Sequence, residues 1–394
     1  MKILMLLQKE FPPDIRVEKE VKALQKAGFE IHVLCRNRKK KKDEIIHGIY
    51  VDRLKPLSNI PILHSIVNFP LFLNPFWIRH ALRIIKRENI DFIHAHDLPM
   101  MPLGLIVSAG KIPVFYDMHE NYPAAMEIWN AHKPLSRLFK THWLAKKLDT
   151  YCCHSARHIF VVVEEQKRRL VDEGIESEKI TIVGNRTEID EFLSIPVDRA
   201  IIHRYRDQFV ILYTGSFSED RGLEIPIRAL KSLSSRIPNI KLVLVGDGPN
   251  RERLESLVKA EGISQFVEFT GWQPFRTIPS FIRGSSICIV PQPSNAFIDT
   301  TVPHKLFQYM ALKKPVVVSD AKPLARWVNK LKAGEIFASA RSEQFANSVL
   351  KIYNNDSQYY PFKNSEIFDV LDWKNDAANL VATYLQYGSQ KHLC

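Results

Sequence analysis

The sequence predicts an α/β protein built from two doubly wound domains with parallel sheets. Short runs of β-branched residues alternate with amphipathic segments almost from end to end. A polar stretch, SIPVDRAIIHRYRDQ at 194–208, interrupts this pattern before a fresh apolar run begins. A chain of 394 residues can form two hydrophobic cores. We therefore expect domains at 1–200 and 205–370, and a final helical segment at 371–394 that is a candidate for crossing back to the first domain.

The first half contains a series of short apolar runs that read as buried strands. They are ILMLL (3–7), IHVL (31–34), FIHA (92–95), VFYD (114–117), IFVVV (159–163) and ITIV (180–183). Between the first two lies DIRVEKEVKALQKAGFE, with apolar residues at 17, 21, 24 and 27 and a glycine near its end. This spacing is typical of an amphipathic helix, so the segment predicts a strand–helix–strand unit.

The second half repeats the plan without a sequence repeat that can be aligned. Its predicted strands are FVILYTG (209–215), KLVLVGDGP (241–249), VEFTG (267–271), SSICIVP (285–291) and PVVVS (315–319). The segment WKNDAANLVATYLQYG at 373–388 predicts the final helix.

Composition and charge narrow the class of protein. With 45% hydrophobic and 25% charged residues, the chain resembles an ordinary soluble protein. Its formal charge is +12, with basic clusters at 36–42 (RNRKKKK) and 164–170 (EEQKRRL). Such clusters suit an anionic partner, whether nucleotide phosphate, acidic membrane surface or nucleic acid, and they equally suit a solvated surface.

Cysteine usage and hydropathy suggest the compartment. Five cysteines show neither even pairing nor metal-ligand spacing, so we expect a reducing cytoplasm. The start MKILMLLQKE predicts a buried strand rather than a signal peptide. No window has the roughly 18 to 20 apolar residues of a spanning helix. The nearest, at 59–86, is either an interfacial segment or a buried loop and helix, which leaves peripheral membrane association open.

Ligands of open parallel sheets bind beyond the carboxyl ends of the strands, so the expected site is a cleft between the loops of the two domains. In the first domain those loops carry Asp14, Asp97, His119 and Glu120. Asp14 is also a natural helix N-cap, and a single histidine is often only a hydrogen-bonded residue. No GxGxxG motif follows the first strand, which disfavours a dinucleotide-binding dehydrogenase.

In the second domain, the loop YTGSFSEDRGLE at 213–224 carries Gly215, which allows close backbone approach, and Arg221, which can meet a phosphate. The stretch TTVPHKLFQYMALKKPVVVSD at 300–320 predicts a helix that opens at 301–303. The backbone N–H groups at the start of this helix have no partners within the helix. They are either capped by nearby groups or available to bind an anion. Lys305 adds a positive charge there, and His304 and Gln308 share one face.

Several motifs together resemble the retaining nucleotide-sugar glycosyltransferases of family four, which have a GT-B fold with two Rossmann-like domains facing across a cleft. They are FPPDIRVEKEVKALQKAGFEI, HAHDLPMMPLG with YDMHENYP, GSFSEDRGLE, LVGDGP and TVPHKLFQYMALKKPVVVSD. Their order and spacing cover nearly the whole chain. The resemblance implies a nucleoside diphosphate sugar bound by the second domain and an acceptor bound by the first, with no metal and no further cofactor.

The resemblance also implies roles for individual residues. Arg221 matches one of the two cations that grip the diphosphate, and Ser216 stands where the other is usual. The family has glutamates at the positions of Thr300 and Gln308, so we expect Thr300 or Thr301 on the sugar or phosphate and Gln308 on the ribose. His119 resembles the family's histidine near the anomeric centre, and with Arg221 and Lys305 it forms the expected catalytic set. Gly215 and His304 complete the expected donor site.

The predicted function is transfer of a hexose-type sugar, with retention, to a polysaccharide, a glycolipid or another acceptor. The expected partners are a nucleotide sugar, a carbohydrate or lipid-linked acceptor and an anionic membrane surface, with no specific nucleic acid. The alternatives are a catalytically diverged GT-B binding protein, which the missing carboxylates and the positive charge favour, and a sugar-nucleotide epimerase.

Overall fold

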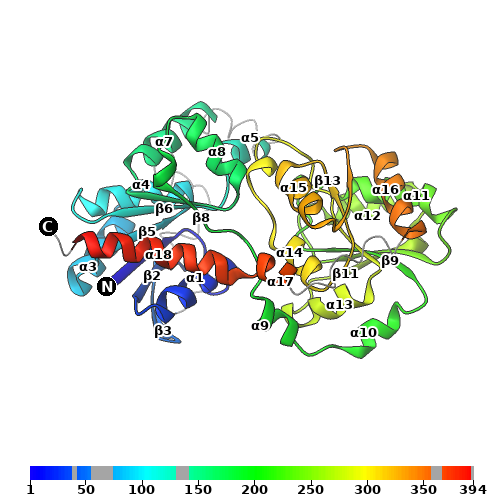
Figure 1. Ribbon diagram of the computed structural model, residues 1–394, viewed down its shortest axis with the longest axis horizontal. Coiled ribbons are helices and arrows are strands. Elements are labelled where there is room, and N and C mark those ends of the chain that lie inside the picture. Colours follow the sequence, from blue (N-terminus) through cyan, green and yellow to red (C-terminus); the bar gives the residue numbers. More distant parts are fainter. Residues whose placement is uncertain (38–41, 55–73, 130–141, 356–365, 392–394) are drawn as a thin grey trace. The chain divides into compact units, whose positions relative to one another are not determined.

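The computed structural model describes residues 1–37, 42–54, 74–129, 142–355 and 366–391 (Figure 1). Its contacts divide the chain into two compact units. Unit 1 comprises Met1–Gly184 together with Asp376–Cys394, and unit 2 comprises Asn185–Asn375. The sequence pattern predicts a change of domain at 200–205, whereas residues 185–204 group with unit 2.

The described part of unit 1 contains an eight-stranded sheet in the order β3-β4-β2-β1-β5-β6-β7-β8. Neighbouring strands run parallel, except that β3 pairs antiparallel with β4 at one edge. The strands are β1 (Lys2–Leu7), β2 (Glu30–Arg36), β3 (Glu44–Ile46), β4 (Ile49–Leu54), β5 (Phe92–His96), β6 (Val114–Met118), β7 (His158–Val161) and β8 (Ile180–Ile182).

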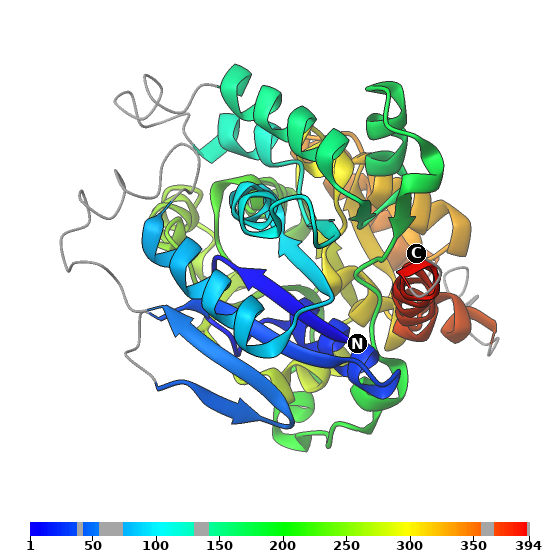
Figure 2. The same ribbon diagram turned by 90° about the vertical axis from the view of Figure 1, so that its left-hand side faces the viewer.

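Helices cover both faces of this sheet. Figure 2 shows α3 (Pro75–Glu88) and α4 (Asp97–Ser108) on one side, with α1 (Ile15–Lys26) and the red α18 (Trp373–Lys391) on the other. The other helices among the described residues of the unit are α5 (Tyr122–Trp129), α7 (His142–Ser155) and α8 (Glu164–Asp172), with a 3₁₀ turn, η1 (Ser177–Lys179), before β8. The residues of α18 from Asp376 onward thus return to the unit in which the chain began.

The period-two alternation of strands decides which side chains meet which helices. Ile93 and Ala95 of β5 join the core cluster that includes α3 and α4. The intervening residues, His94 and His96, therefore point to the face covered by α1 and α18. Consistent with this, the imidazole of His94 contacts the Tyr384 hydroxyl of α18.

Unit 2 contains a six-stranded parallel sheet, within the described residues, in the order β11-β10-β9-β12-β13-β14. The strands are β9 (Phe209–Thr214), β10 (Ile240–Val245), β11 (Val267–Gly271), β12 (Ile287–Val290), β13 (Val316–Ser319) and β14 (Gly334–Phe337). The two parallel-sheet α/β domains predicted from the sequence are therefore confirmed.

The helices of unit 2 begin with two short segments that follow the crossing from unit 1. The α-helices are α9 (Ile189–Ser194), α10 (Arg199–Arg204), α11 (Glu224–Ser234), α12 (Arg251–Ala260), α13 (Ile278–Gly284), α14 (His304–Ala311), α15 (Lys322–Leu331), α16 (Ser342–Asn354) and α17 (Glu366–Leu371). The 3₁₀ turns are η2 (Glu219–Arg221), η3 (Ser264–Phe266), η4 (Phe275–Thr277) and η5 (Ile298–Thr300).

Local differences from the predicted elements have physical causes. Strand β14 is short and three of its four residues are only half-buried, so its pattern is weak. The helix predicted to open at 301–303 begins at His304, and Thr301 and Pro303 are extended. Proline disfavours the helical region for the residue before it, which keeps Val302 out of the helix.

Some features of the sequence fall partly outside the described residues. Of the basic cluster 36–42, positions 38–41 lie outside, as does Cys394. The apolar window 59–86 is described only from residue 74, where α3 buries Trp77, Ala81 and Ile84. Among the described helices none has the length and apolar character needed to cross a membrane.

Candidate functional site

Two glycine-containing loops pack closely against each other at the carboxyl edge of the sheet in unit 2. Gly215, directly after β9, has a φ of +130°, which favours glycine. A Cβ on Gly246, after β10, would collide with the carbonyl oxygen of Gly215, and a Cβ on Gly248 would lie 2.6 Å from the nitrogen of Phe217. The Phe217 N–H donates to the carbonyl of Asp247 at 2.9 Å. These contacts fix the backbone of the loop that follows β9.

The side chain of Lys305 reaches from α14 to this loop. Its Nζ lies 3.7 Å from the ring centroid of Tyr213 and 2.6 Å from the position that a Cβ on Gly215 would take. Burial lowers the pKa of Lys305 well below its ordinary value, and the positive charge of Arg221 lowers it further. Within the described residues no hydrogen bond or ion pair of the Lys305 ammonium is present. The half-buried Lys305 ammonium is thus attracted by the Asp220 carboxylate without forming an ion pair with it.

Hydrogen bonds to the end of β9 and to Asn185 hold α14 in this place. The buried Tyr309 hydroxyl accepts a hydrogen bond from the Thr214 N–H at 2.8 Å, which ties the helix to the end of β9. The His304 imidazole contacts the carbonyl oxygen of Asn185 at 2.9 Å, and the Asn185 amide donates to the Val302 carbonyl. His304 therefore anchors the start of α14 to the first residue of unit 2.

Arg221 lies on the turn η2 of the same loop. Its Nε donates to the Ser218 hydroxyl at 3.2 Å and lies 3.4 Å from the Asp220 carboxylate. The next residue, Gly222, has a φ of +66°, and a Cβ there would collide with the carbonyl oxygen of Pro291. Side chains other than glycine are thus excluded at position 222. The charge of Arg221 lies close enough to lower the pKa of Lys305.

The remaining residues predicted for the donor site occupy different surroundings. Thr300 is buried, and its hydroxyl donates to the carbonyls of Phe297 and Ala296 at 2.9 and 3.2 Å. Thr301 is half-buried and extended. The carbonyl oxygen of Ser216 accepts from the Tyr213 hydroxyl at 2.8 Å. Gln308 is buried on α14, one turn after His304.

Gln292 is a further residue at this edge that the sequence analysis did not single out. It follows β12 and is 1% exposed, and its Oε1 has no hydrogen-bond donor in the described part of the chain. The sequence could not identify Gln292 as a site residue. A glutamine between two prolines after a strand looks like any other loop residue.

In unit 1, His119 directly follows β6 and lies between two carboxylates. Its Nε2 is 2.9 Å from Oδ2 of Asp117, and its Nδ1 is 3.5 Å from Oδ2 of Asp97. The backbone N–H of His119 also donates to Oδ1 of Asp97 at 3.1 Å. Burial alone would lower the pKa of His119, but the two carboxylates outweigh burial and raise it to about 9. The imidazole, 14% exposed, is thus held in its charged form.

Asp117 is in turn held by α1. Arg16 donates from Nη2 and Nε to the two Asp117 oxygens at 2.7 and 3.3 Å, and its Nε lies 3.0 Å from the Glu20 carboxylate. Burial would raise the pKa of Asp117, but Arg16 and His119 hold it well below its usual range. Burial and the charge of Asp117 raise the pKa of Glu20 well above its ordinary value.

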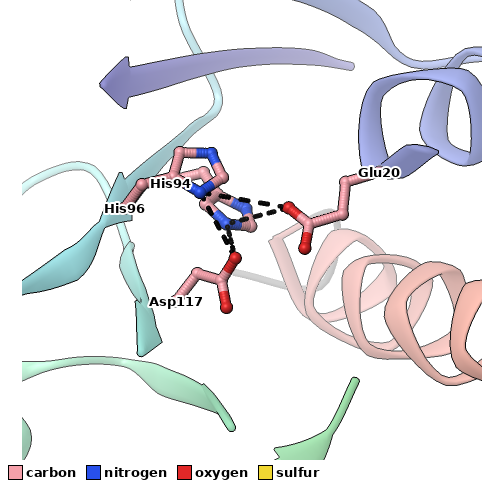
Figure 3. Close-up of side chains that lie close together, drawn as sticks. All are labelled: Glu20, His94, His96 and Asp117. Atoms are coloured by element: carbon pink, nitrogen blue, oxygen red, sulfur yellow. Dashed lines mark ion pairs between the residues drawn. The ribbon is translucent and has the colours of Figure 1, made fainter. Parts of the chain in front are cut away.

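Figure 3 shows Glu20, His94, His96 and Asp117 converging beside α18, with one nitrogen or oxygen atom of each within 4.8 Å of the others. The His94 Nε2 is 3.5 Å from Asp117 Oδ2, and the His96 Nδ1 is 3.3 Å from the same oxygen. Burial lowers the pKa of both histidines, and that of His96 falls to about 3. Since Arg16 and His119 already supply positive charge to Asp117, we interpret the group as a buried charge network that supports His119.

The other two residues predicted in unit 1 are placed apart from this network. Asp14 caps α1, accepting from the N–H groups of Arg16 and Val17 at 3.2 Å each. Glu120 follows His119 and is half-buried. The structure therefore brings together His119 and Asp97 of the predicted set, and adds Asp117, which the sequence analysis counted as a strand residue.

The two sites offer different chemistry. Unit 2 presents a fixed glycine loop with two neighbouring cations, an arrangement suited to an anionic group such as a diphosphate. Unit 1 presents an imidazolium whose charge and orientation are set by carboxylates. Such a group can donate a hydrogen bond to an oxygen that develops negative charge.

Both halves of the chain match known protein families. Residues 15–191 match the family described as Glycosyltransferase Family 4, and residues 194–365 match the family described as Glycosyl transferases group 1. Among curated proteins, the uncharacterized glycosyltransferase MJ1178 of Methanocaldococcus jannaschii is 24% identical over 87% of this chain and 84% of its own length.

Solved structures share the fold over almost the whole chain. Sucrose-phosphate synthase from Thermosynechococcus elongatus superposes with a TM-score of 0.79 at 17% identity, covering 99% of this chain and 100% of that one. Anabaena Alr3699/HepE in complex with UDP-glucose superposes with a TM-score of 0.71 at 18% identity, covering 98% and 100%.

Proposed function

This chain belongs to the family 4-like glycosyltransferases of GT-B fold, and we propose that it transfers a hexose-type sugar from a nucleoside diphosphate sugar to an acceptor hydroxyl. The donor binds to unit 2, and the acceptor, a carbohydrate or a lipid-linked saccharide, binds to unit 1. UDP-glucose bound to Alr3699/HepE makes a uridine diphosphate sugar the first donor class to test.

The observation that carries this proposal is the Lys305 ammonium beside Gly215, which forms no ion pair or hydrogen bond within the described residues. A diphosphate would supply a direct ionic partner for Lys305, and the glycine leaves room for the ammonium beside the loop. Arg221, on the same loop, can add a second charge-assisted hydrogen bond. Because negative charge accumulates on the diphosphate as the glycosidic bond breaks, both cations bind the transition state more strongly than the ground state.

In unit 1, His119 is the group that we propose acts near the reacting carbon. Its charged imidazole can donate a hydrogen bond to a sugar hydroxyl, while Asp97 and Asp117 fix the direction of the ring. Asp117 acts through His119 and is a positioning residue.

We further propose that the anomeric configuration is retained and that no metal ion takes part. Retention would follow from attack on the face that the diphosphate leaves, with a diphosphate oxygen accepting the proton of the acceptor hydroxyl. Lys305 and Arg221 would supply the positive charge that a metal ion otherwise gives to a departing diphosphate.

A second candidate function is a diverged GT-B protein that binds a nucleotide sugar without transferring it, or that epimerises the sugar. Thr300 favours this alternative, because its hydroxyl already donates to backbone carbonyls. Gln308 favours it as well, since an amide cannot provide a carboxylate's charge.

A panel of uridine- and guanosine-diphosphate sugars tests these candidates in two steps. Calorimetry reports which donor binds, and mass spectrometry of reactions with and without acceptor saccharides reports what is formed. Transfer predicts a product that contains the acceptor, whereas epimerisation predicts donor conversion without any acceptor. Absence of binding across the panel would contradict every form of the proposal.

A further inference from the structure

Helix α3 of unit 1 exposes cations and large apolar side chains on one side. Arg79, Arg83 and Lys86 are exposed, and so are Phe76 and Leu82 at 53% and 46%. At 100° per residue these five side chains fall on one continuous face. The one acidic residue of the helix, Glu88, forms ion pairs with Lys2 and Arg87 away from this face.

Helix α7 repeats this arrangement. Trp143 and Tyr151 are 63% and 64% exposed, and Lys146 and Lys147 lie between them along the helix. The Lys147 Nζ is 3.8 Å from the Trp143 ring centroid. The one acidic residue of α7, Asp149, is buried on the opposite side, where it pairs with Arg169.

The two helices belong to one layer. Both pack against α4, and Figure 2 shows the cyan α4 between the light-blue α3 and the green α7. The buried sides of all three join the same core cluster, so their exposed sides form the outer surface of that layer. Ile106 of α4 adds a 45% exposed apolar side chain between the two basic helices. We call this surface the outer helix layer.

The combination of groups identifies the kind of partner. Exposed aromatic and aliphatic side chains gain from burial in hydrocarbon, and cations gain from anionic headgroups. Trp and Tyr are enriched at membrane interfaces because their rings are amphipathic. A nucleic acid would use the cations, but it would leave Leu82 and Ile106 without an apolar partner.

We propose that the outer helix layer docks unit 1 on an anionic lipid membrane. The lysines and arginines contact headgroups, and Phe76, Leu82, Trp143 and Tyr151 enter the interface. This inference deepens the proposed function, because docking would bring unit 1 to a lipid-linked acceptor. Docking itself needs neither donor nor turnover.

Vesicle flotation with the full chain tests the proposal, using phosphatidylcholine vesicles with and without phosphatidylglycerol. Arg79→Glu/Arg83→Glu is expected to weaken binding to the anionic vesicles at least about 25-fold, since each cation contributes a factor of about five. Lys231→Glu/Lys259→Glu in unit 2, where both lysines are exposed, changes the net charge equally and is expected to leave binding unchanged. Equal weakening by both pairs would overturn the proposal.

A second variant separates lipid insertion from charge attraction. Trp143→Ser keeps all the cations and is expected to weaken binding to anionic vesicles about tenfold, because a large apolar surface no longer enters the interface. Unchanged vesicle binding by this variant, or binding of the wild-type chain to an oligonucleotide but not to anionic vesicles, would contradict membrane docking. Donor binding measured on the same preparations shows whether the proposed function fails independently.

Discussion

The carboxylate of Asp117 and the ammonium of Lys305 lie near the carboxyl ends of their respective sheets, but their charges are balanced differently. Asp117 is paired with Arg16 and His119, and both of these partners belong to unit 1. Lys305 lies over a tyrosine ring beside a glycine. A charge that is already compensated serves stability and positioning. A partly buried charge without a direct ion pair costs stability until a ligand supplies that partner.

The largest effect is expected from removing the ion pairs of Asp117. Asp117→Ala leaves Arg16 buried without its bidentate partner and should lower the free energy of unfolding by about 3 to 5 kcal/mol. Urea unfolding, followed by circular dichroism, measures the loss, and Asp117→Asn provides a milder variant if the alanine form does not fold. Asp172→Ala, at an exposed position of α8, is the control and should change little. Equal stability of all these variants would mean that the network does not hold unit 1 together.

The charge on His119 should make stability depend on pH. Its pKa is raised from 6.5 to about 9, so its stabilising contribution is fully present below pH 6.5 and is lost as the pH rises through about 9. The loss is about 3 kcal/mol for such a shift. Urea unfolding across this range should show the decline in the wild type and a flatter profile in His119→Gln. Identical profiles would indicate that His119 is neutral in the folded protein.

A smaller effect is expected from replacing Arg221, which lies near Lys305 in unit 2. Arg221→Ala removes a charge-assisted hydrogen bond to the diphosphate, which should weaken UDP binding by about 1.5 kcal/mol, or roughly tenfold. Calorimetry with UDP measures this change. Arg228→Ala is the matched control, because Arg228 is exposed on α11 and pairs with Glu261 at the surface. An equal loss in both variants would point to long-range charge rather than to contact.

Thr300 should show the smallest effect. Its hydroxyl donates to two backbone carbonyls, so Thr300→Val is expected to leave UDP affinity within about twofold while costing about 1 kcal/mol of stability. Calorimetry and urea unfolding measure the two quantities. A tenfold loss of affinity would show that the hydroxyl contacts the donor, as the sequence analysis predicted.

Much of the fold could be predicted, because buried parallel strands leave unbroken apolar runs such as ILMLL and FVILYTG. The hairpin of β3 and β4 could not. Its turn, with positive φ at His47 and Gly48, joins short and partly polar strands that resemble loop sequence.

The candidate site was predictable only in part. Gly215, Lys305 and His119 follow strands or open helices, and such positions can be read from a pattern. Arg16, Glu20 and Asp117 lie inside elements, where a charged residue is normally assigned to the solvent side. One signal was available, since Arg16 and Glu20 are four apart and adjoin the apolar stripe of Val17 and Val21.

The comparison between the two sites is tested most directly by titrating UDP into the wild type and into Lys305→Met. We predict a dissociation constant at least about tenfold higher in the variant. We also predict a free energy of unfolding that is unchanged within about 1 kcal/mol, because the lost cation–π contact is offset by the removal of a partly buried charge. An unchanged dissociation constant would contradict the assignment of Lys305 to the diphosphate. A large loss of stability would contradict its description as a charge without a direct ion pair.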